Sequence, residues 1–413
     1  MSRKKYFYKN RENLKRVYDI FRNTQFGRRL SLPIWDIDNY INFKKLPLVD
    51  PRYVNFDELF VPAEGLWNFV TSGVSGKIKS AYRDIGTIVG YPKYMDLDLR
   101  SNGAVFLHSK RREGESYYET HDVNHKRMYP NAIFAEYKNA DQLLMYAQKG
   151  TILFIIEYPL MVEWICYQLE KAIKNKEILP ERLIKKKVYL ELSGEPINEE
   201  QLKCVVHRLT KIFQCEVEHF VTYGSNEIGH IGTYIPSLHG CKVVYEIIPS
   251  LFVEEVNGEI IVTPFRTDGT ILFRYRMGDK GELFFVRDRP FVRVLGKSKD
   301  DGILYIAGAQ IDIPEVASKV EKVVANKPVG VECIKTGSAH KGICKLNFKI
   351  HLPKHVDAPL RNKISSSIKQ YVMDSAVLSV ENHLGIVEIK VQYSTSPIKK
   401  RWFIFNGKGG LTT

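Results

Sequence analysis

The sequence has few cysteines, and none of them stands in a paired motif. Six cysteines are scattered over 413 residues without a Cys-x-x-Cys pair. So few thiols cannot cross-link a chain of this length into a disulfide scaffold, and the pattern is typical of a reducing compartment. We therefore expect a cytoplasmic protein whose fold depends on a hydrophobic core.

Long apolar runs are also missing. The most hydrophobic stretch, residues 151–167, contains Glu157, Pro159 and Glu163, whereas a membrane-spanning helix needs about 20 consecutive apolar residues. No apolar segment follows the basic N-terminus, so the sequence does not predict a secretory signal. We interpret residues 151–167 as a buried strand followed by a core helix, with no membrane span.

Acidic residues are fewer than basic ones. The chain has 61 Lys and Arg against 47 Asp and Glu, a formal charge of +14. Such an excess favours anionic partners, for example nucleotides, coenzyme A, acidic carrier proteins or nucleic acid. Seven of the first sixteen residues are Lys or Arg and one is Glu. This arm fits either a surface helix with a solvated basic face or a contact for an anionic partner.

The hydrophobic patterns change along the chain. Strand-like runs alternate with helical runs between about 66 and 250, which predicts a parallel sheet with crossover helices. Short strands with turn signals at 257–258, 268–269 and 279–281 follow, and they predict a small antiparallel β subdomain.

After about residue 298 the order is strand, helix, two paired strands, helix and two last strands. This order predicts a compact α+β domain. The expected fold class is therefore α/β, with a multi-subdomain N-terminal domain of residues 1–298 followed by a small, mobile α+β C-terminal domain of residues 299–413.

A loop rich in glycine and hydroxyl groups, TSGVSGK at residues 71–77, follows an apolar stretch. Its two glycines let the backbone curl around an anion, and the hydroxyls and the lysine add donors, which suits a phosphate cradle. It is not the G-x-x-x-x-G-K-[ST] motif, because only two residues separate the glycines and Ile78 follows the lysine. Taken alone, such a loop is as often a plain turn.

Four further motifs follow: SGEP at 193–196, YGSNEIG at 223–229, RYRMGD at 274–279 and GKSKDD at 296–301. In this order and spacing the set resembles the adenylate-forming superfamily of acyl-CoA synthetases, peptide-synthetase adenylation domains and luciferases, most closely the phenylacetate:coenzyme A ligase-like branch. The resemblance implies an AMP-forming ligase that activates an aryl or small organic acid as acyl-AMP with release of pyrophosphate. It further implies transfer of the acyl group to a thiol of coenzyme A or a carrier protein.

The resemblance also implies ligands for ATP and Mg²⁺, the expected cofactors. Glu227 is the expected Mg²⁺ ligand and a catalytic residue, since hard cations favour carboxylate oxygen. Asp279 is the expected partner of the ribose, with Arg276, Arg293 and Lys297 as supporting contacts. The remaining expected nucleotide contacts are Thr71, Ser72, Gly73, Ser75, Gly76 and Lys77 at the phosphates, and Ser193, Gly194, Glu195, Pro196, Tyr223, Gly224, Ser225 and Asn226 around the adenine.

In this superfamily a C-terminal Gly-Lys-x-x-Arg type motif supplies a lysine that bridges the carboxylate and the α-phosphate. Here no glycine precedes the lysines; Lys399 aligns best and Lys400 second, and a charge run without a catalytic role remains an alternative. The expected hinge between the domains lies at Lys299 or Asp300. The expected acyl pocket contains Tyr158, Pro159, Leu192 and Gly229.

Other functions stay open from the sequence alone. One is an amide- or ester-forming adenylating enzyme of a natural-product or polysaccharide pathway. Another is a non-catalytic nucleotide-binding or nucleic-acid-binding relative, which the missing glycine before Lys399 and the basic N-terminal arm motivate. Nucleic acid is the weaker partner, because neither a zinc finger nor an aromatic RNA-binding motif occurs. A monomer and a dimer are both compatible with the sequence.

Overall fold

The computed structural model describes the helices, the strands and most of their connections. The described residues are 1–32, 37, 39–51, 53–71, 79–84, 93–101, 103–109, 123–195, 197–236, 242–297, 303–306, 309–325, 329–338, 343–352, 356–373, 384, 386–394 and 402–406.

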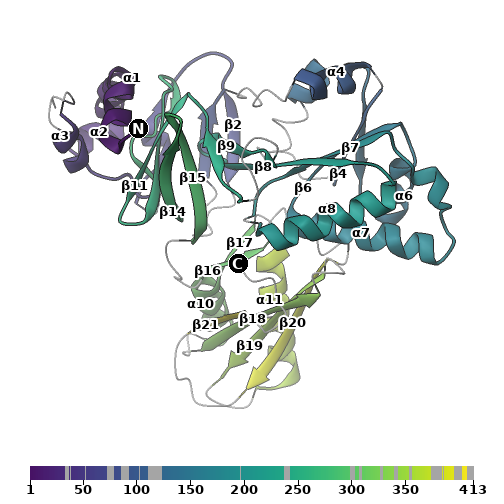
Figure 1. Cartoon of the computed structure of the whole chain (residues 1–413). Coiled ribbons are helices and arrows are strands. Elements are labelled where there is room, and N and C mark those ends of the chain that lie inside the picture. Colours follow the sequence, from purple (N-terminus) through teal and green to yellow (C-terminus); the bar gives the residue numbers. More distant parts are fainter. Residues whose placement is uncertain are drawn as a thin grey trace.

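One mixed sheet of eleven strands organises the larger part of the chain (Figure 1), in the order β11-β12-β14-β15-β10-β9-β8-β7-β6-β4-β5. The parallel strands are β4 (Val105–Ser109), β5 (Ile133–Tyr137), β6 (Ile152–Glu157), β7 (Lys187–Leu192) and β8 (Val217–Ser225). The antiparallel strands are β9 (Gly229–Tyr234), β10 (Tyr245–Ile247), β11 (Leu251–Val256), β12 (Glu259–Pro264), β14 (Tyr275–Val286) and β15 (Arg289–Lys297). The predicted α/β class is confirmed, and the antiparallel strands continue the parallel ones in a single sheet.

Helices cover both faces of the parallel strands. Helices α6 (Ala140–Ala147), α7 (Pro159–Lys174) and α8 (Glu199–Phe213) share one core with Leu153 and Ile155 of β6, whereas α4 (Lys93–Ser101) packs with Phe154. Side chains of a strand point alternately to opposite faces, so all six positions of β6 are buried. None of the helices that the structure describes is long and apolar enough to cross a membrane.

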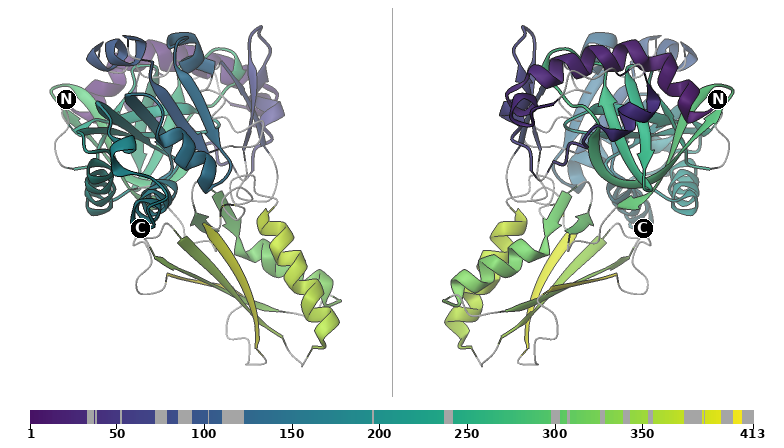
Figure 2. Two further views of the ribbon diagram at one scale, coloured as in Figure 1. Left: turned by 90° about the vertical axis from the view of Figure 1, so that its right-hand side faces the viewer. Right: turned by 90° about the vertical axis from the view of Figure 1, so that its left-hand side faces the viewer.

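The N-terminal segment packs against the antiparallel strands (Figure 2). Helix α1 (Arg3–Asn23) buries Leu14, Val17, Tyr18 and Phe21, which is the face that the helical period predicts. Two short helices follow it, α2 (Gln25–Arg29) and α3 (Tyr40–Lys45), and the irregular segment after them leads to η1 (Phe56–Leu59) and β1 (Phe60–Val61).

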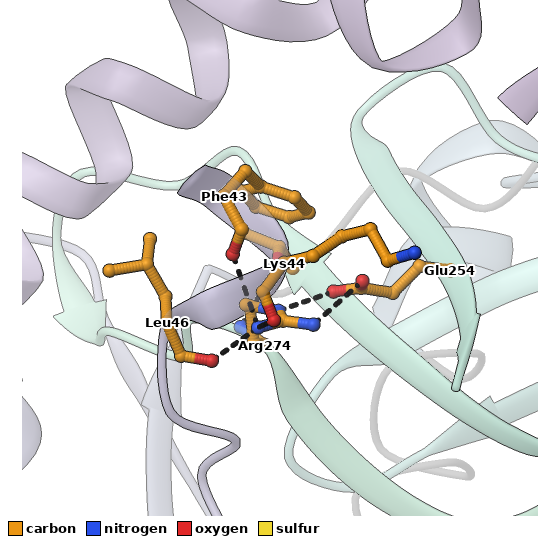
Figure 3. Close-up of polar contacts among 6 residues, drawn as sticks. Phe43, Lys44, Leu46, Glu254 and Arg274 are labelled. Carbon is orange, nitrogen blue, oxygen red and sulfur yellow. Dashed lines mark hydrogen bonds and ion pairs between the residues drawn. The ribbon is translucent and has the colours of Figure 1, made fainter. Parts of the chain in front are cut away.

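Arg274 holds this N-terminal segment on the sheet (Figure 3). Its guanidinium forms two hydrogen bonds with the carboxylate of Glu254, at 2.8 and 2.9 Å. Its Nη1 also donates to the backbone carbonyls of Phe43, Lys44 and Leu46. These carbonyls lie at and just beyond the C-terminal end of α3, where a helix leaves its last carbonyls without backbone partners. The arginine therefore satisfies a helix end and a buried carboxylate together.

A smaller four-stranded sheet forms the C-terminal part, in the order β20-β19-β18-β21. Its strands are β18 (Gly330–Ser338), β19 (Ile343–His351), β20 (Val387–Ser394) and β21 (Trp402–Asn406), and helices α10 (Ile313–Val323) and α11 (Ala358–Met373) lie together on one face (Figure 2). The hairpin of β16 (Ile303–Ile306) and β17 (Ala309–Asp312) precedes them. We propose two domains, residues 1–298 and 299–413, and the separate sheets support this division.

One turn prediction is wrong. Residues 279–281 lie inside β14, at a register shift between Lys280 and Gly281, and the chain turns instead at Arg287 and Asp288, where φ is 46° and 61°. A Cβ on Gly281 would lie 2.7 Å from the carbonyl oxygen of Arg293. The glycine therefore permits a close approach of strands at a bulge, which its sequence context does not distinguish from a turn.

We predict that Arg274→Met destabilises the protein by about 3–5 kcal/mol, because the carboxylate of Glu254 and the α3 carbonyls lose their donors inside the protein. Urea unfolding followed by circular dichroism measures the loss. Arg289→Met is the matched control: it removes an ion pair to Glu246 at 2.8 Å whose arginine is 55% exposed, and it should cost below about 1 kcal/mol. Equal losses in both variants would contradict the role of Arg274.

Candidate functional site

The expected phosphate loop is bounded by a hairpin. Strands β2 (Trp67–Thr71) and β3 (Lys79–Arg83) are antiparallel, and Thr71 pairs with Lys79 across the hairpin. The hairpin thus brings the two ends of the loop together. Ser72, Gly73, Ser75, Gly76 and Lys77 lie outside the described residues, as does the side chain of Thr71.

The expected adenine turn leaves the carboxyl end of β7 and contacts the expected acyl pocket. Gly194 has φ +78°, and a Cβ there would lie 1.9 Å from the ring of Tyr158. The ring therefore packs directly on the glycine backbone. Tyr158 is also the residue before α7, whose first position is Pro159, a favourable helix start. Ser193 donates its backbone N–H to the carbonyl of Glu157 at 3.3 Å.

These residues gather where several parallel strands end. Leu192, the last residue of β7, pairs with Glu157 on one side and Val221 on the other. Ligands of open α/β sheets bind beyond the carboxyl ends of the strands. The structure thus brings Leu192, Ser193 and Gly194 together with Tyr158, while Pro196 lies outside the described residues.

A tyrosine and a carboxylate from two distant motifs meet on the sheet. The hydroxyl of Tyr223, in β8, donates to Oδ2 of Asp279, in β14, at 2.9 Å. Burial raises the pKa of Tyr223, and the charge of Asp279 raises it further. Tyr223 therefore keeps its proton and acts as the donor. Its ring packs against Tyr245 with centroids 5.3 Å apart, so the expected adenine and ribose contacts are neighbours.

Glu227 lies on the turn between β8 and β9. Ser225 Oγ accepts the backbone N–H of Ile228 at 3.2 Å, which closes the turn. The hydroxyl of Tyr275 lies 3.4 Å from Oε1 of Glu227. Gly224 is needed for the turn, because a Cβ on it would lie 2.5 Å from the carbonyl oxygen of Gly229.

The chemistry of this turn fits Mg²⁺. Glu227 offers carboxylate oxygen, and Mg²⁺ carrying a triphosphate needs only one or two protein carboxylates beside the phosphate oxygens and water. Among the described residues no group of three or more His, Cys, Asp and Glu is placed to hold a metal. Glu227 is thus suited to share a metal with a phosphate ligand rather than to enclose it.

Two arginines that the sequence analysis did not select support this turn. Arg83 Nε donates to the carbonyl of Asn226 at 3.2 Å, and Arg266 Nη2 donates to the carbonyls of Glu227 and Ile228 at 3.2 and 2.7 Å. Burial lowers the pKa of Arg83 to about 9 and that of Arg266 to about 10, so both are charged at pH 7. No local signal identifies them, since an arginine at a strand end or before a turn is typical of a solvated surface.

Of the supporting contacts expected at the ribose, Arg276 has other partners in the structure. Arg276 forms ion pairs with Glu259 at 2.6 Å and with Asp50 at 3.1 Å, so its charge already braces β12 and the N-terminal segment against β14. Arg293 is exposed on β15 and lies opposite Glu282. The backbone of Lys297 pairs with Asp279. The side chain of Lys297, and Lys299, Asp300, Lys399 and Lys400 as a whole, lie outside the described residues.

No protein-family model and no curated protein sequence matches the chain. Solved structures do match it. The structure of 2-hydroxyisobutyryl-CoA ligase with 2-HIB-AMP and CoA in the thioesterification state has a TM-score of 0.67 and 11% identity, over 98% of this chain and 91% of that chain. An open conformation of the same ligase has a TM-score of 0.46 and 11% identity, over 96% and 89% of the two chains. The structure of an acyl acid amido synthetase with 2,4-DB has a TM-score of 0.47 and 13% identity, over 93% of this chain and 86% of that chain. The chain therefore shares the fold of this 2-hydroxyisobutyryl-CoA ligase over nearly its whole length.

Proposed function

We propose that this chain is an ATP-dependent, AMP-forming ligase that activates a carboxylic acid as its acyl adenylate. The observation that carries the proposal is the hydrogen bond of 2.9 Å between Tyr223 and Asp279, which joins an aromatic ring and a diol-binding carboxylate from motifs in β8 and β14. Glu227 lies four residues beyond Tyr223, on the turn between β8 and β9. The fold supports the proposal, because the similar ligase structure contains an acyl adenylate, 2-HIB-AMP.

Each of these residues has a physical role in nucleotide binding. A carboxylate accepts several hydrogen bonds, so Asp279 can accept from Tyr223 and from the hydroxyls of a ribose. The ring of Tyr223, held by this bond and by Tyr245, offers a fixed aromatic face to adenine. Gly194 lets the backbone pass close to the ring of Tyr158. The proposed adenine turn therefore lies directly beside the proposed acyl pocket.

In the first reaction, an oxygen of the acid's carboxylate attacks the α-phosphorus of ATP. A new bond joins this oxygen to phosphorus, and the bond from phosphorus to the pyrophosphate oxygen breaks. Mg²⁺, when bound, would neutralise charge on the phosphates. We assign to Glu227 the binding of this ion, and to Lys77 and Lys399 the placing of positive charge beside the triphosphate and the attacking carboxylate. Lys400 is the alternative to Lys399.

For the second reaction we propose thioester formation on coenzyme A or on an acidic carrier protein. A thiolate attacks the acyl carbon, the acyl–oxygen bond to phosphate breaks, and AMP leaves. The charge of +14 supports an anionic acceptor. We assign the acid pocket to Tyr158, Pro159, Leu192 and Gly229, and we propose an aryl or small organic acid as its ligand, as the resemblance implies.

ATP–pyrophosphate exchange with a panel of aryl and alkyl acids tests the first reaction. We expect exchange that depends on the acid, and mass spectrometry of the trapped acyl adenylate then identifies the acid. Adding coenzyme A, a carrier protein or an amine to the same mixture distinguishes thioester from amide formation. Absence of exchange with every acid, together with absence of ATP binding, would refute the ligase.

Asp279→Asn should weaken ATP binding by about 10-fold or more, because a hydrogen bond to a charged group contributes about 1.5–3 kcal/mol. Tyr223→Phe should weaken binding less, since the carboxylate survives. Isothermal titration calorimetry with ATP measures both effects. Asp288→Asn, in the exposed turn between β14 and β15, is the control that should bind ATP like the parent. Unchanged affinity of Asp279→Asn would remove Asp279 from the site.

Lys399→Ala should lower the rate of adenylation by about 100-fold, as the loss of a charge that stabilises a transition state does, while Lys400→Ala should retain most of the rate. Single-turnover formation of the acyl adenylate is the measurement. The reverse order of effects would assign the role to Lys400. If both variants keep the parent rate, neither lysine is catalytic, and a parent without activity would favour the non-catalytic relative.

A further inference from the structure

The turn that carries Glu227 is held by guanidinium groups on three consecutive backbone carbonyls. Asn226 accepts from Arg83, and Glu227 and Ile228 both accept from Arg266. A short turn normally leaves such carbonyls to water. Here their partners come from elements that are distant in the sequence, so the fold fixes the turn in addition to the hydrogen bond that Ser225 makes within it.

Arg83 enters from the phosphate-loop hairpin. Its guanidinium carbon lies 3.8 Å from the ring centroid of Phe69 in β2, and the side chain is only 5% exposed. Gly229, at the other end of the turn, has φ +88°, and a Cβ there would lie 3.3 Å from the guanidinium. The guanidinium is therefore packed between the hairpin and the turn, and its planar shape suits this position.

Arg266 enters from the segment between β12 and β13 (Gly269–Thr270). This segment is fastened to the same hairpin, because the backbone N–H of Tyr82 in β3 donates to Thr270 Oγ1 at 2.8 Å. A Cβ on Gly269 would lie 2.2 Å from the carbonyl oxygen of Tyr82. Both arginines thus connect the Glu227 turn to the base of the hairpin that bears the phosphate loop.

The charges of the buried Arg83 and the half-buried Arg266 repel each other, and burying such charges lowers stability unless polar groups compensate them. Asp84 lies near both arginines and Asp268 near Arg266, where their charges oppose the effect of burial. Nη1 of Arg266 is nevertheless buried without a hydrogen-bond partner among the groups that the structure describes. Two apolar side chains in place of the arginines would cost less free energy in this region. The arginines therefore indicate that the turn requires hydrogen-bond donors.

We propose that Arg83 and Arg266 are positioning residues that fix the turn bearing the Glu227 carboxylate on the base of the β2–β3 hairpin, so that Glu227 would be held in place to bind Mg²⁺. The proposal rests on the proposed function of Glu227. The hydroxyl of Tyr275, 3.4 Å from Oε1 of Glu227, fixes the far end of the same side chain. Groups that orient a metal ligand through hydrogen bonds change metal affinity by about 10–100-fold when they are lost.

The test compares ATP binding with Mg²⁺ and with EDTA by isothermal titration calorimetry. In the parent, Mg²⁺ should raise the affinity for ATP. In Arg266→Met and in Arg83→Met this gain should fall by about 10-fold, whereas the affinity in EDTA should stay within about twofold of the parent. Arg208→Met is the matched control, since Arg208 forms a bidentate pair with Glu170 at 2.8 and 2.7 Å between α8 and α7; both of its affinities should equal those of the parent.

A double-mutant cycle separates positioning from a general loss of structure. In a Glu227→Gln background, Arg266→Met should have no further effect on the gain from Mg²⁺, because the two changes act on one ligand. Additive losses, or equal losses in Mg²⁺ and in EDTA, would overturn the proposal. Arg266→Lys and Arg83→Lys, which keep the charge and lose the planar fork, serve if the methionine variants do not fold, and they should show a smaller loss of the same gain.

The outcomes also separate this proposal from the proposed function. A parent that does not bind ATP, or binds it equally well in EDTA, refutes the magnesium site and the positioning role together. A parent with a clear gain from Mg²⁺ and arginine variants with the same gain refutes the positioning role alone, and leaves the ligase in place.

Discussion

The buried guanidinium of Arg274 is the interaction on which the larger part of the structure depends. It joins the end of α3 to Glu254 of β11, and its own backbone carbonyl accepts the N–H of Val49 at 3.0 Å. The backbone segment that follows α3 therefore lies beside the start of β14. Strand β14 then carries Tyr275 to Glu227 and, four residues later, Asp279 to Tyr223. The start of this strand therefore sets where Asp279 meets Tyr223 and where Tyr275 reaches Glu227.

Strand β8 is the second constraint, because the sheet changes its character there. It pairs in parallel with β7 and antiparallel with β9. On the parallel side of β8 lie the strand ends that are followed by Tyr158 and Gly194. On its antiparallel side, β14 carries Asp279. Tyr223 contributes to both, since it lies in β8 and donates to Asp279 at 2.9 Å. The proposed nucleotide site beside β8 therefore combines residues at the ends of parallel strands with a carboxylate on an antiparallel strand.

Local patterns predicted the elements well where the signal lies within one segment. Helix α8 (Glu199–Phe213) follows from its own residues, because Asn198 caps its first turn and its apolar residues recur on one face. The motifs also predicted that Tyr223 and Asp279 share a site. The sequence could not predict the hydroxyl–carboxylate bond between them, or the engagement of Arg276 by Glu259 and Asp50. Such contacts depend on strand register and on pairs that are far apart in the chain.

The same limit explains why the sequence motifs did not identify Arg83 and Arg266. These two arginines also change the interpretation of the net charge. Both, like Arg274, bind chiefly backbone carbonyls, which carry partial negative charge but do not enter the count of acidic residues. On the N-terminal arm, Arg3 pairs with Glu255 and Lys5 lies 3.8 Å from Asp288. The ion pairs of the arm are neutral in sum, whereas Arg83 and Arg266, which hold backbone carbonyls, account for part of the excess of +14. A basic composition is then compatible with a protein whose anionic partner is a nucleotide, because the arginines that raise the charge are in part those that shape the site.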